Sequence, residues 1–204
     1  MPAERAGSVA GILLAAGAST RMGSNKLLFT LEGEPMVHRA ARRALEAGLD
    51  PVIVVLGHEA ERVREALEGL DCLIALNPEH TRGVNRSLKA GMAELPPAAC
   101  ATVVMLADMP YVTSAMIESM VARYRTGSAP LVISDYQGTN APPMLYDRSL
   151  FLELGAMEGE GCGRQVVRRH RAEADVISWP ADALADVDVP ADYERMRDAS
   201  GGLT

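Results

Sequence analysis

Residues 12–28 combine small residues and cations at a spacing suited to binding a polyanion. An apolar run, residues 9–14, leads into a loop whose small residues let backbone N–H groups approach a ligand closely: Gly17, Ser19, Thr20 and Gly23. Arg21 and Lys26 add the positive charge that neutralises bound phosphate. A buried strand that ends in such a loop is where α/β proteins bind nucleotide phosphates, so this segment is a candidate phosphate site.

Two common phosphate-binding motifs are absent from this loop. The pattern Gly-x-x-x-x-Gly-Lys-Ser/Thr is missing because Lys26 is followed by Leu27 instead of a hydroxyl residue. The pattern Gly-x-Gly-x-x-Gly is missing because the glycines stand at positions 17 and 23. The alternative interpretation of the loop, on its residues alone, is a glycine-rich turn with two solvated cations.

Asp108 is a second candidate, because it directly follows the apolar run 102–106. A carboxylate in this position lies at the carboxyl edge of a sheet, where open α/β folds bind ligands. Mg²⁺ favours one or two protein carboxylates together with phosphate oxygens and water, so Asp108 opposite a phosphate loop suits this ion. The alternative is an aspartate that forms an Asx-turn before Pro110.

The elements that must position these residues alternate between strands and helices. The apolar runs predict strands at residues 9–14, 51–56, 72–76, 102–106, 131–136, 144–146, 174–177 and 184–187. Helical spacing predicts helices at residues 36–45, 63–70, 88–95, 113–124, 149–154 and 163–171, and from 190 onward. Thr113 is the expected N-cap of one of them, and residues 137–140 form a turn-rich link. This alternation predicts a parallel sheet with helices on both faces.

Composition limits the class of protein. The chain has 204 residues, 48% hydrophobic and 23% charged, which is typical of one soluble domain. The net charge of −7 argues against nucleic acid as a partner. No apolar run reaches the length of about 18 residues that a transmembrane helix needs. Residues 1–8 lead into no secretory signal, so we expect a cytoplasmic protein without a membrane segment.

The remaining reactive residue types show no pattern of their own. Cys72 and Cys100 are expected to be inert core thiols, and Cys162 has no paired base that would make it a nucleophile. The histidines have no metal-ligand spacing and are expected on the surface or in loops. The basic run 168–171 is expected to be a solvated helix face.

The string at residues 14–28, Leu-Ala-Ala-Gly-x-Ser-x-Arg-Met-Gly-x-x-Lys-Leu-Leu, resembles the signature of nucleotidyltransferases related to the molybdenum cofactor cytidylyl- and guanylyltransferases. The segment Ala-Asp-Met-Pro at 107–110 belongs to the same resemblance, which spans residues 12–193. It implies a single-domain, Rossmann-like α/β/α fold in three layers, glycosyltransferase-A-like, with a mostly parallel sheet. Residues 8–110 would then bind the nucleotide and residues 111–198 the acceptor.

The resemblance also implies roles for individual residues. Arg21 and Lys26 would be catalytic, because they would neutralise the triphosphate and the transition state. The implied nucleotide-binding residues are Leu14, Ala15, Ala16, Gly17, Arg21, Lys26, Asn77, Gly83 and Ser87. Asp108 and Asp188 would hold Mg²⁺, the implied cofactor. Residues 186–193 depart from the closing motif Asp-Thr-Pro-Glu-Asp at Val189 and Ala191, and the alternative role of Asp188 is to cap the last helix.

Three residues are implied to bind the acceptor: Pro143, Gly161 and Arg164. Residues 159–164 resemble the motif Gly-Asp-x-Gly-Ala-Arg, with Glu160 and Gly163 as departures. Arg164 would act as an anion clamp, while the alternative is a surface loop that caps a helix. Residues 84–86, Val-Asn-Arg, also depart from the family, which usually has Met and small hydroxylated residues there.

The implied reaction is transfer of CMP from CTP to molybdopterin with release of pyrophosphate. The form Leu-Ala-Ala-Gly resembles the cytidylyl branch, whereas the guanylyl branch more often has Leu-Ala-Gly-Gly. The alternatives are guanylyl transfer to the molybdenum cofactor, transfer to a sugar or polyol phosphate, and a catalytically silent binding or chaperone protein for molybdenum hydroxylases. The implied partners are an NTP, molybdopterin or another phosphorylated acceptor, and a molybdenum hydroxylase as client.

Overall fold

The computed structural model describes residues 5–18, 23–158, 161, 163–185 and 192–194. The strands are β1 (Ser8–Ala15), β2 (Thr30–Leu31), β3 (Glu34–Pro35), β4 (Val52–Leu56), β5 (Leu73–Leu76), β6 (Ala99–Leu106), β7 (Leu131–Tyr136), β8 (Thr139–Asp147) and β9 (Asp175–Trp179). The α-helices are α1 (Met36–Glu46), α2 (Ala60–Glu65), α3 (Val84–Ala93), α4 (Ser114–Thr126), α5 (Phe151–Gly155) and α6 (Arg164–Arg169). The 3₁₀-helices are η1 (Lys26–Leu28), η2 (His80–Arg82), η3 (Arg148–Leu150), η4 (Arg171–Glu173) and η5 (Ala181–Leu184).

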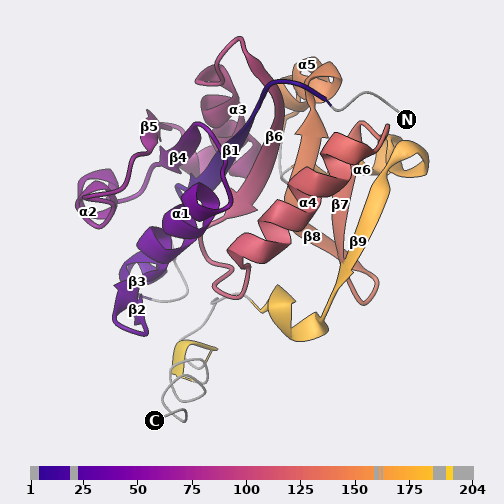
Figure 1. Ribbon diagram of the computed structural model, residues 1–204. Coiled ribbons are helices and arrows are strands. Elements are labelled where there is room, and N and C mark those ends of the chain that lie inside the picture. Colours follow the sequence, from indigo (N-terminus) through magenta and orange to yellow (C-terminus); the bar gives the residue numbers. More distant parts are fainter. Residues whose placement is uncertain (1–4, 19–22, 159–160, 162, 186–191, 195–204) are drawn as a thin grey trace.

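One seven-stranded sheet runs through the molecule in the order β5-β4-β1-β6-β8-β7-β9 (Figure 1). The pairs β5-β4, β4-β1, β1-β6 and β7-β9 are parallel. Only β8 runs against its two neighbours in this sheet, β6 and β7. The predicted mostly parallel sheet is therefore confirmed, with β8 as its single reversed strand.

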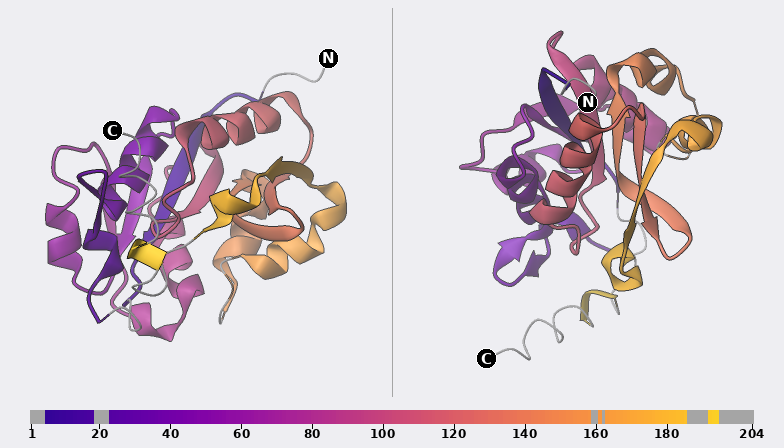
Figure 2. Two further views of the ribbon diagram at one scale, coloured as in Figure 1. Left: turned by 90° about the horizontal axis from the view of Figure 1, so that it is seen from below. Right: turned by 45° about the vertical axis from the view of Figure 1, so that its right-hand side comes forward.

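Helices cover both faces of the sheet, as Figures 1 and 2 show for α1 and α4 in front and α3 behind. On one face, apolar residues of α1, α2 and α4 pack against Leu13, Val54 and Val103. On the other face, residues of α3, α5 and α6 pack against Ile12 and Val55. Successive strand residues point to opposite faces, so fully apolar strands such as β4 supply both cores. The three-layer arrangement is confirmed.

Helix α3 lies unusually close to the sheet at Gly91. A Cβ atom on Gly91 would come within 2.6 Å of Ile12 Cγ2 and 2.9 Å of Val55 Cγ2. Real Cβ atoms do not approach that closely, so any larger residue would push α3 away from β1 and β4. The absence of a side chain at Gly91 lets the last turns of α3 pack directly on β1 and β4.

Several predicted elements differ from the observed ones, among them the helix expected at 63–70, which is α2 at Ala60–Glu65. The strand expected at 144–146 is longer, because β8 begins at Thr139 after a hairpin turn in which Gln137 and Gly138 both have positive φ. The strand expected at 184–187 is wrong at its start, since Leu184 ends the 3₁₀-helix η5, and residues 186–187 lie outside the described residues. Thr113 does cap α4, where its hydroxyl accepts from Met116 N at 3.2 Å. Among the described residues, no helix has both the length and the apolar character needed to cross a bilayer.

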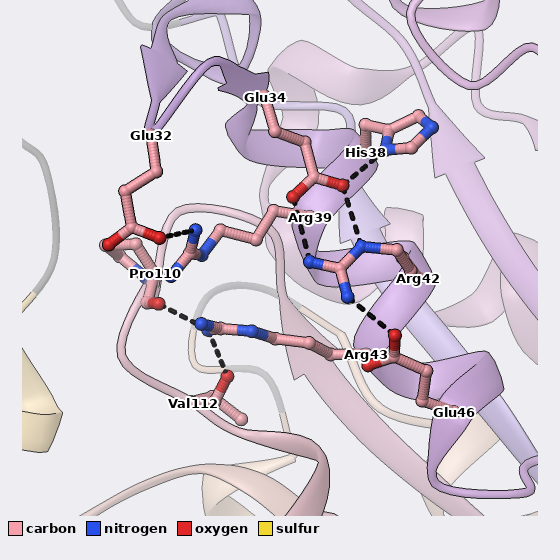
Figure 3. A network of polar contacts seen from close by, with 9 residues as sticks. All are labelled: Glu32, Glu34, His38, Arg39, Arg42, Arg43, Glu46, Pro110 and Val112. Carbon is pink, nitrogen blue, oxygen red and sulfur yellow. Dashed lines mark hydrogen bonds and ion pairs between the residues drawn. The ribbon is translucent and has the colours of Figure 1, made fainter.

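A polar network ties helix α1 to the β2–β3 hairpin (Figure 3). The Glu34 carboxylate accepts from Nε and Nη2 of Arg42, both at 2.9 Å, and lies 2.6 Å from His38 Nδ1. Glu32 accepts from Arg39 at 2.7 Å on the same side of the helix. The hydrogen bond from Arg42 holds the pKa of Glu34 at about 2. The start of α1 is thus fixed relative to the hairpin.

We expect Glu34→Gln to lower the free energy of unfolding at neutral pH. Because folding depresses the pKa of Glu34, its contribution is present above the unfolded pKa of about 4.5 and is lost as the pH falls towards about 2. Thermal unfolding followed from neutral to acidic pH measures the difference between wild type and variant, which is expected to shrink over this window. Glu61→Gln, on an exposed ion pair, is the control, and a difference for Glu34→Gln that does not change with pH contradicts the prediction.

Candidate functional site

The carboxyl ends of β1, β4 and β6 meet at one edge of the sheet. Three backbone hydrogen bonds hold the loops there: His58 N donates to Ala16 O at 3.3 Å, Asn77 N to Leu56 O at 2.8 Å, and Ala107 N to Leu14 O at 3.1 Å. These bonds continue the strand ladders past the ends of the strands. The residues that follow β1 and β6 are consequently fixed side by side.

Lys26 and Asp108 face each other across this edge. Lys26 opens η1, whose N-cap is Asn25, with its side-chain Oδ1 accepting from Leu27 N at 3.2 Å. Lys26 Nζ lies 2.7 Å from Asp108 Oδ2, and the two side chains are 11% and 24% exposed. A charge-assisted contact at this distance neutralises both groups. An incoming phosphate or metal ion would compete with this contact.

A cavity of about 360 Å³ surrounds this ion pair. It is lined by Leu14, Ala15, Ala16, Gly17, Lys26, Leu27, His80, Thr81, Gly83, Val84, Ser87, Leu106 and Asp108. We call it the first cavity. The predicted nucleotide-binding residues therefore converge on one space, apart from Arg21, which lies outside the described residues, and Asn77.

Asn77 lies behind the first cavity, where it supports Ser87. It is 5% exposed, and its Nδ2 donates to Ser87 Oγ at 2.9 Å. Its Oδ1 accepts from Glu79 N at 3.0 Å. Both polar atoms of the side chain are thus used to fix the loop between β5 and α3. Asn77 orients the Ser87 hydroxyl that lines the cavity.

His80 is a cavity residue that the sequence did not single out. A Cβ atom on Gly57 would come within 2.5 Å of His80 Cβ and 2.9 Å of Ala16 Cβ, so only glycine lets these two residues meet. The histidine was expected on the surface or in a loop; it lies in η2 and lines the first cavity. A glycine directly after a predicted strand was the available signal for this close approach.

A second cavity, of about 680 Å³, adjoins the first. It is lined by Val84, Leu106, Met109, Thr139, Asn140, Ala141, Pro142, Met144, Gly161, Arg164, Gln165, Arg168 and Leu184. Val84 and Leu106 line both cavities. Two ligands bound in the two cavities would meet at these residues, with Asp108 on one side and Met109 on the other.

The residues expected to bind an acceptor lie mostly in this second cavity. Gly161 and Arg164 line it, whereas Pro142 takes the place expected for Pro143. Pro143 is buried, and its carbonyl accepts from Ser134 Oγ at 2.7 Å. Arg168 is exposed, as expected for a solvated helix face, and it also lines the cavity one helical turn after Arg164. The spacing i, i+4 on one helix puts both guanidinium groups on the same side.

Hydrogen bonds from neighbouring strands fix the part of β8 that lines the second cavity. Trp179 Nε1 donates to Ser134 Oγ at 2.9 Å, and Tyr136 OH donates to Pro142 O at 2.9 Å. Burial raises the pKa of Tyr136 to about 12, so its hydroxyl keeps its proton and remains a donor at neutral pH. These contacts fix the backbone that lines the second cavity.

Asn85 joins the two halves of the site. It is 3% exposed near the start of α3, and its Nδ2 donates to the carbonyl of Glu158 at 3.1 Å. Glu158 immediately precedes the loop that resembles the acceptor motif. The departure from the family pattern at residues 84–86 thus contributes a tether between α3 and that loop.

Besides Arg21, two residues singled out in the sequence cannot be placed. Asp188 and Glu160 lie outside the described residues. Within the described part of the chain, no group of three His, Cys, Asp or Glu side chains could hold a metal ion. Asp108 alone suits a divalent cation that completes its shell with phosphate oxygens and water. The donor set fits a metal ion that arrives with a nucleotide.

Comparison with known proteins relates this chain to a protein family. The family model of the MobA-like NTP transferase domain matches residues 11–174. The purine catabolism protein PucB of Bacillus subtilis (strain 168) is 28% identical to this chain, with 93% of this chain and 96% of PucB covered.

Solved structures agree in fold. Rv0371c from Mycobacterium tuberculosis H37Rv has a TM-score of 0.84 at 25% identity, covering 95% of this chain and 100% of that chain. Its complex with manganese has a TM-score of 0.78 at 26% identity, covering 94% and 99%. Mth528, a nucleotidyl transferase from Methanothermobacter thermautotroptrophicus, has a TM-score of 0.81, covering 97% and 99%, and at 21% identity this likeness concerns the fold alone.

Proposed function

The chain belongs to the family of MobA-like NTP transferase domains, and from that premise we propose that it transfers CMP from CTP to molybdopterin. An acceptor phosphate oxygen attacks the α-phosphorus, the bond from that phosphorus to the bridging oxygen breaks, and pyrophosphate leaves. Little covalent work falls to the protein in such a reaction. It positions two anions that repel each other and stabilises the charge that develops.

The observation that carries this proposal is the pair of adjoining cavities. The first holds the Lys26–Asp108 pair and the backbone of residues 14–17, which we assign to the NTP. The second has an apolar wall and two guanidinium groups, which we assign to the acceptor. Both cavities end at Val84 and Leu106, so bound ligands would bring their reacting ends together there.

Each charged residue has a role in this arrangement. Lys26, with Arg21, neutralises the triphosphate and the transition state. Asp108, with Asp188, holds Mg²⁺, which polarises phosphate oxygens when bound. The manganese complex of Rv0371c supports a divalent cation in this family. The backbone of residues 14–17 would contact the base edge.

Molybdopterin matches the lining of the second cavity. A flat ring system suits the apolar wall that includes Met109, Ala141 and Met144. A phosphate group suits Arg164 and Arg168, because guanidinium groups bind phosphate oxygens through paired N–H donors. Sugar phosphates also carry a phosphate group but have less apolar surface. We therefore propose them as the second candidate for the acceptor.

A pyrophosphate-release screen tests this function. Each of the four common NTPs is combined with molybdopterin or with a panel of sugar and polyol phosphates, in the presence of Mg²⁺. Release with CTP and molybdopterin is the expected result. Release only with GTP, or only with a sugar phosphate, replaces the substrate and keeps the reaction class. Binding of NTP and acceptor without release in any combination indicates a silent binding protein.

Ala16→Gly is expected to relax the preference for CTP over GTP. Ala16 is 4% exposed and lines the first cavity, so its methyl group limits the room for a purine. A pocket difference of this kind is worth about 10–200-fold in kcat/KM. Competition kinetics with both nucleotides measures the ratio, and Ala93→Gly, at the exposed end of α3, controls for general loosening. Equal kcat/KM for CTP and GTP in the wild type contradicts the cytidylyl assignment and leaves nucleotidyl transfer intact.

A further inference from the structure

Asp108 lies at the start of a loop with few internal hydrogen bonds. The loop runs from Asp108 to the N-cap of α4 at Thr113, and one backbone bond, from Val112 N to Met109 O at 3.3 Å, closes a turn within it. Pro110 has no N–H group to donate. The carbonyl oxygens of Pro110 and Val112 therefore need donors from elsewhere in the fold.

Arg43 supplies those donors from behind the site. Figure 3 shows its guanidinium extending from α1 to the loop, where Nη1 donates to Pro110 O at 2.5 Å and to Val112 O at 2.7 Å. Charge-assisted bonds of this length are among the stronger ones in proteins. These two carbonyl groups lie two and four residues after Asp108. Fixing both of them fixes the direction in which the chain leaves β6.

The charges around Arg43 distinguish it from its neighbours on α1. Arg39 and Arg42 pair with the carboxylates of Glu32 and Glu34. Within the described part of the chain Arg43 forms no ion pair. Burial, together with the positive charges of Arg39 and Arg42, lowers the pKa of Arg43 from its usual value. Among the described residues, the hydrogen-bond acceptors of this partly buried guanidinium are the two backbone carbonyls, and its burial costs solvation free energy.

Helix α1 also contacts the segment that carries Lys26. Met36 N, at the start of α1, donates to Phe29 O at 2.9 Å, directly after η1. The same helix therefore touches the loop of Lys26 at one end and the loop of Asp108 through Arg43. The distance between the two charged groups of the first cavity depends on this helix.

We propose that Arg43 is a positioning residue that holds Asp108 in the geometry needed to bind a divalent cation with the nucleotide. The expected effect on turnover rests on the proposed function. The contact between Arg43 and the Asp108 loop is independent of that function. Replacing the guanidinium frees two carbonyl groups and lets the Asp108 loop move. Supporting residues behind a metal ligand typically contribute about 10–100-fold in metal affinity or activity.

The test compares Arg43→Met with Arg42→Met, which removes the same charge from the same helix without touching the loop. Hydrogen exchange of the backbone amides of residues 107–113 is measured without ligand. Mn²⁺ binding is then measured by electron paramagnetic resonance with a non-hydrolysable NTP analogue, followed by kcat for pyrophosphate release. Arg43→Lys and Arg43→Gln, which keep part of the donor set, serve as milder variants in case Arg43→Met does not fold.

We expect Arg43→Met to speed exchange in residues 107–113, to raise the Kd for Mn²⁺ about 10–100-fold and to lower kcat, with partial recovery in Arg43→Lys. Arg42→Met is expected to lower Tm and leave the Mn²⁺ affinity unchanged. Unchanged exchange, or faster exchange with unchanged Mn²⁺ affinity, overturns the positioning role. A wild type that binds neither Mn²⁺ nor nucleotide overturns the proposed function instead, and the exchange result then stands by itself.

Discussion

Lys26→Ala is expected to lower kcat about 10²–10³-fold, because a preorganised donor at developing negative charge typically contributes that much. Lys26 is 9% exposed and lines the first cavity, so its charge is largely shielded from bulk solvent. Negative charge on the phosphate oxygens grows as the α-phosphorus is attacked, and the ammonium group is most valuable at that point. Nucleotide affinity is expected to fall less than kcat.

Steady-state kinetics and equilibrium binding of CTP separate the two effects. Lys89→Ala is the matched control, since Lys89 is exposed on α3 and lies outside the first cavity. Thermal unfolding is measured alongside, because Lys26 is buried and its loss removes the ion pair of Asp108, which is expected to lower Tm. A variant with normal kcat removes Lys26 from catalysis and leaves it a binding or structural residue.

Asp108→Asn is expected to abolish metal-dependent turnover and to leave the fold intact. The side chain is 24% exposed at the end of β6 and takes no part in helix packing, so its loss costs little stability. A neutral amide oxygen is a much weaker ligand for Mg²⁺ than a carboxylate. Activity measured against metal concentration is expected to saturate for the wild type and to stay flat for the variant. Asp188→Asn is expected to act in the same direction with a smaller effect.

The contact between Lys26 and Asp108 adds a second expected result for this variant. A metal ion bound by Asp108 would replace its ion pair with Lys26, so metal and nucleotide binding are expected to be coupled, and such coupling is reciprocal. Asp108→Asn removes the ion pair with Lys26, so the coupling between metal binding and CTP binding is expected to be lost. Asp71→Asn, in an exposed loop, is the control. If Asp108→Asn unfolds the protein, the aspartate is a structural turn residue and the metal assignment is wrong.

The buried parallel strands could be predicted from sequence because their signal is local. Runs such as residues 51–56 are apolar on both faces and are bounded by turn residues, and the observed β4 agrees within a residue. The start of β8 could not be predicted, since Asn140 and the two prolines that follow Ala141 do not resemble a strand. Those prolines fall where the β7–β8 ladder is irregular, between the pairs Ile133–Met144 and Asp135–Asn140, so few ladder bonds need their missing N–H groups.

The residues of the site also fall into those with a local signal in the sequence and those without one. Lys26, Asp108 and Ser87 could be predicted because each stands in a motif next to a strand or at a helix start. Arg43 could not, because the carbonyl oxygens that it binds are 67 and 69 residues away in the chain and carry no side-chain signal. Arg168 is solvated as predicted, and its spacing of four from Arg164 was a local signal that both arginines line the same cavity. The roles of Arg21, Lys26, Asp108 and Ser87 all stay predictions.

The reversed strand β8 limits how the molecule can move during a reaction cycle. Enzymes with two substrates often close two rigid bodies about a hinge. Here strand β6 of the half assigned to the nucleotide pairs with β8 of the half assigned to the acceptor, from Ala101–Asp147 to Val104–Met144. The boundary between the halves is thus a hydrogen-bonded ladder inside one sheet, and opening it would expose the middle of that sheet. Entry of substrates and departure of pyrophosphate are left to the loops and side chains at the sheet edge.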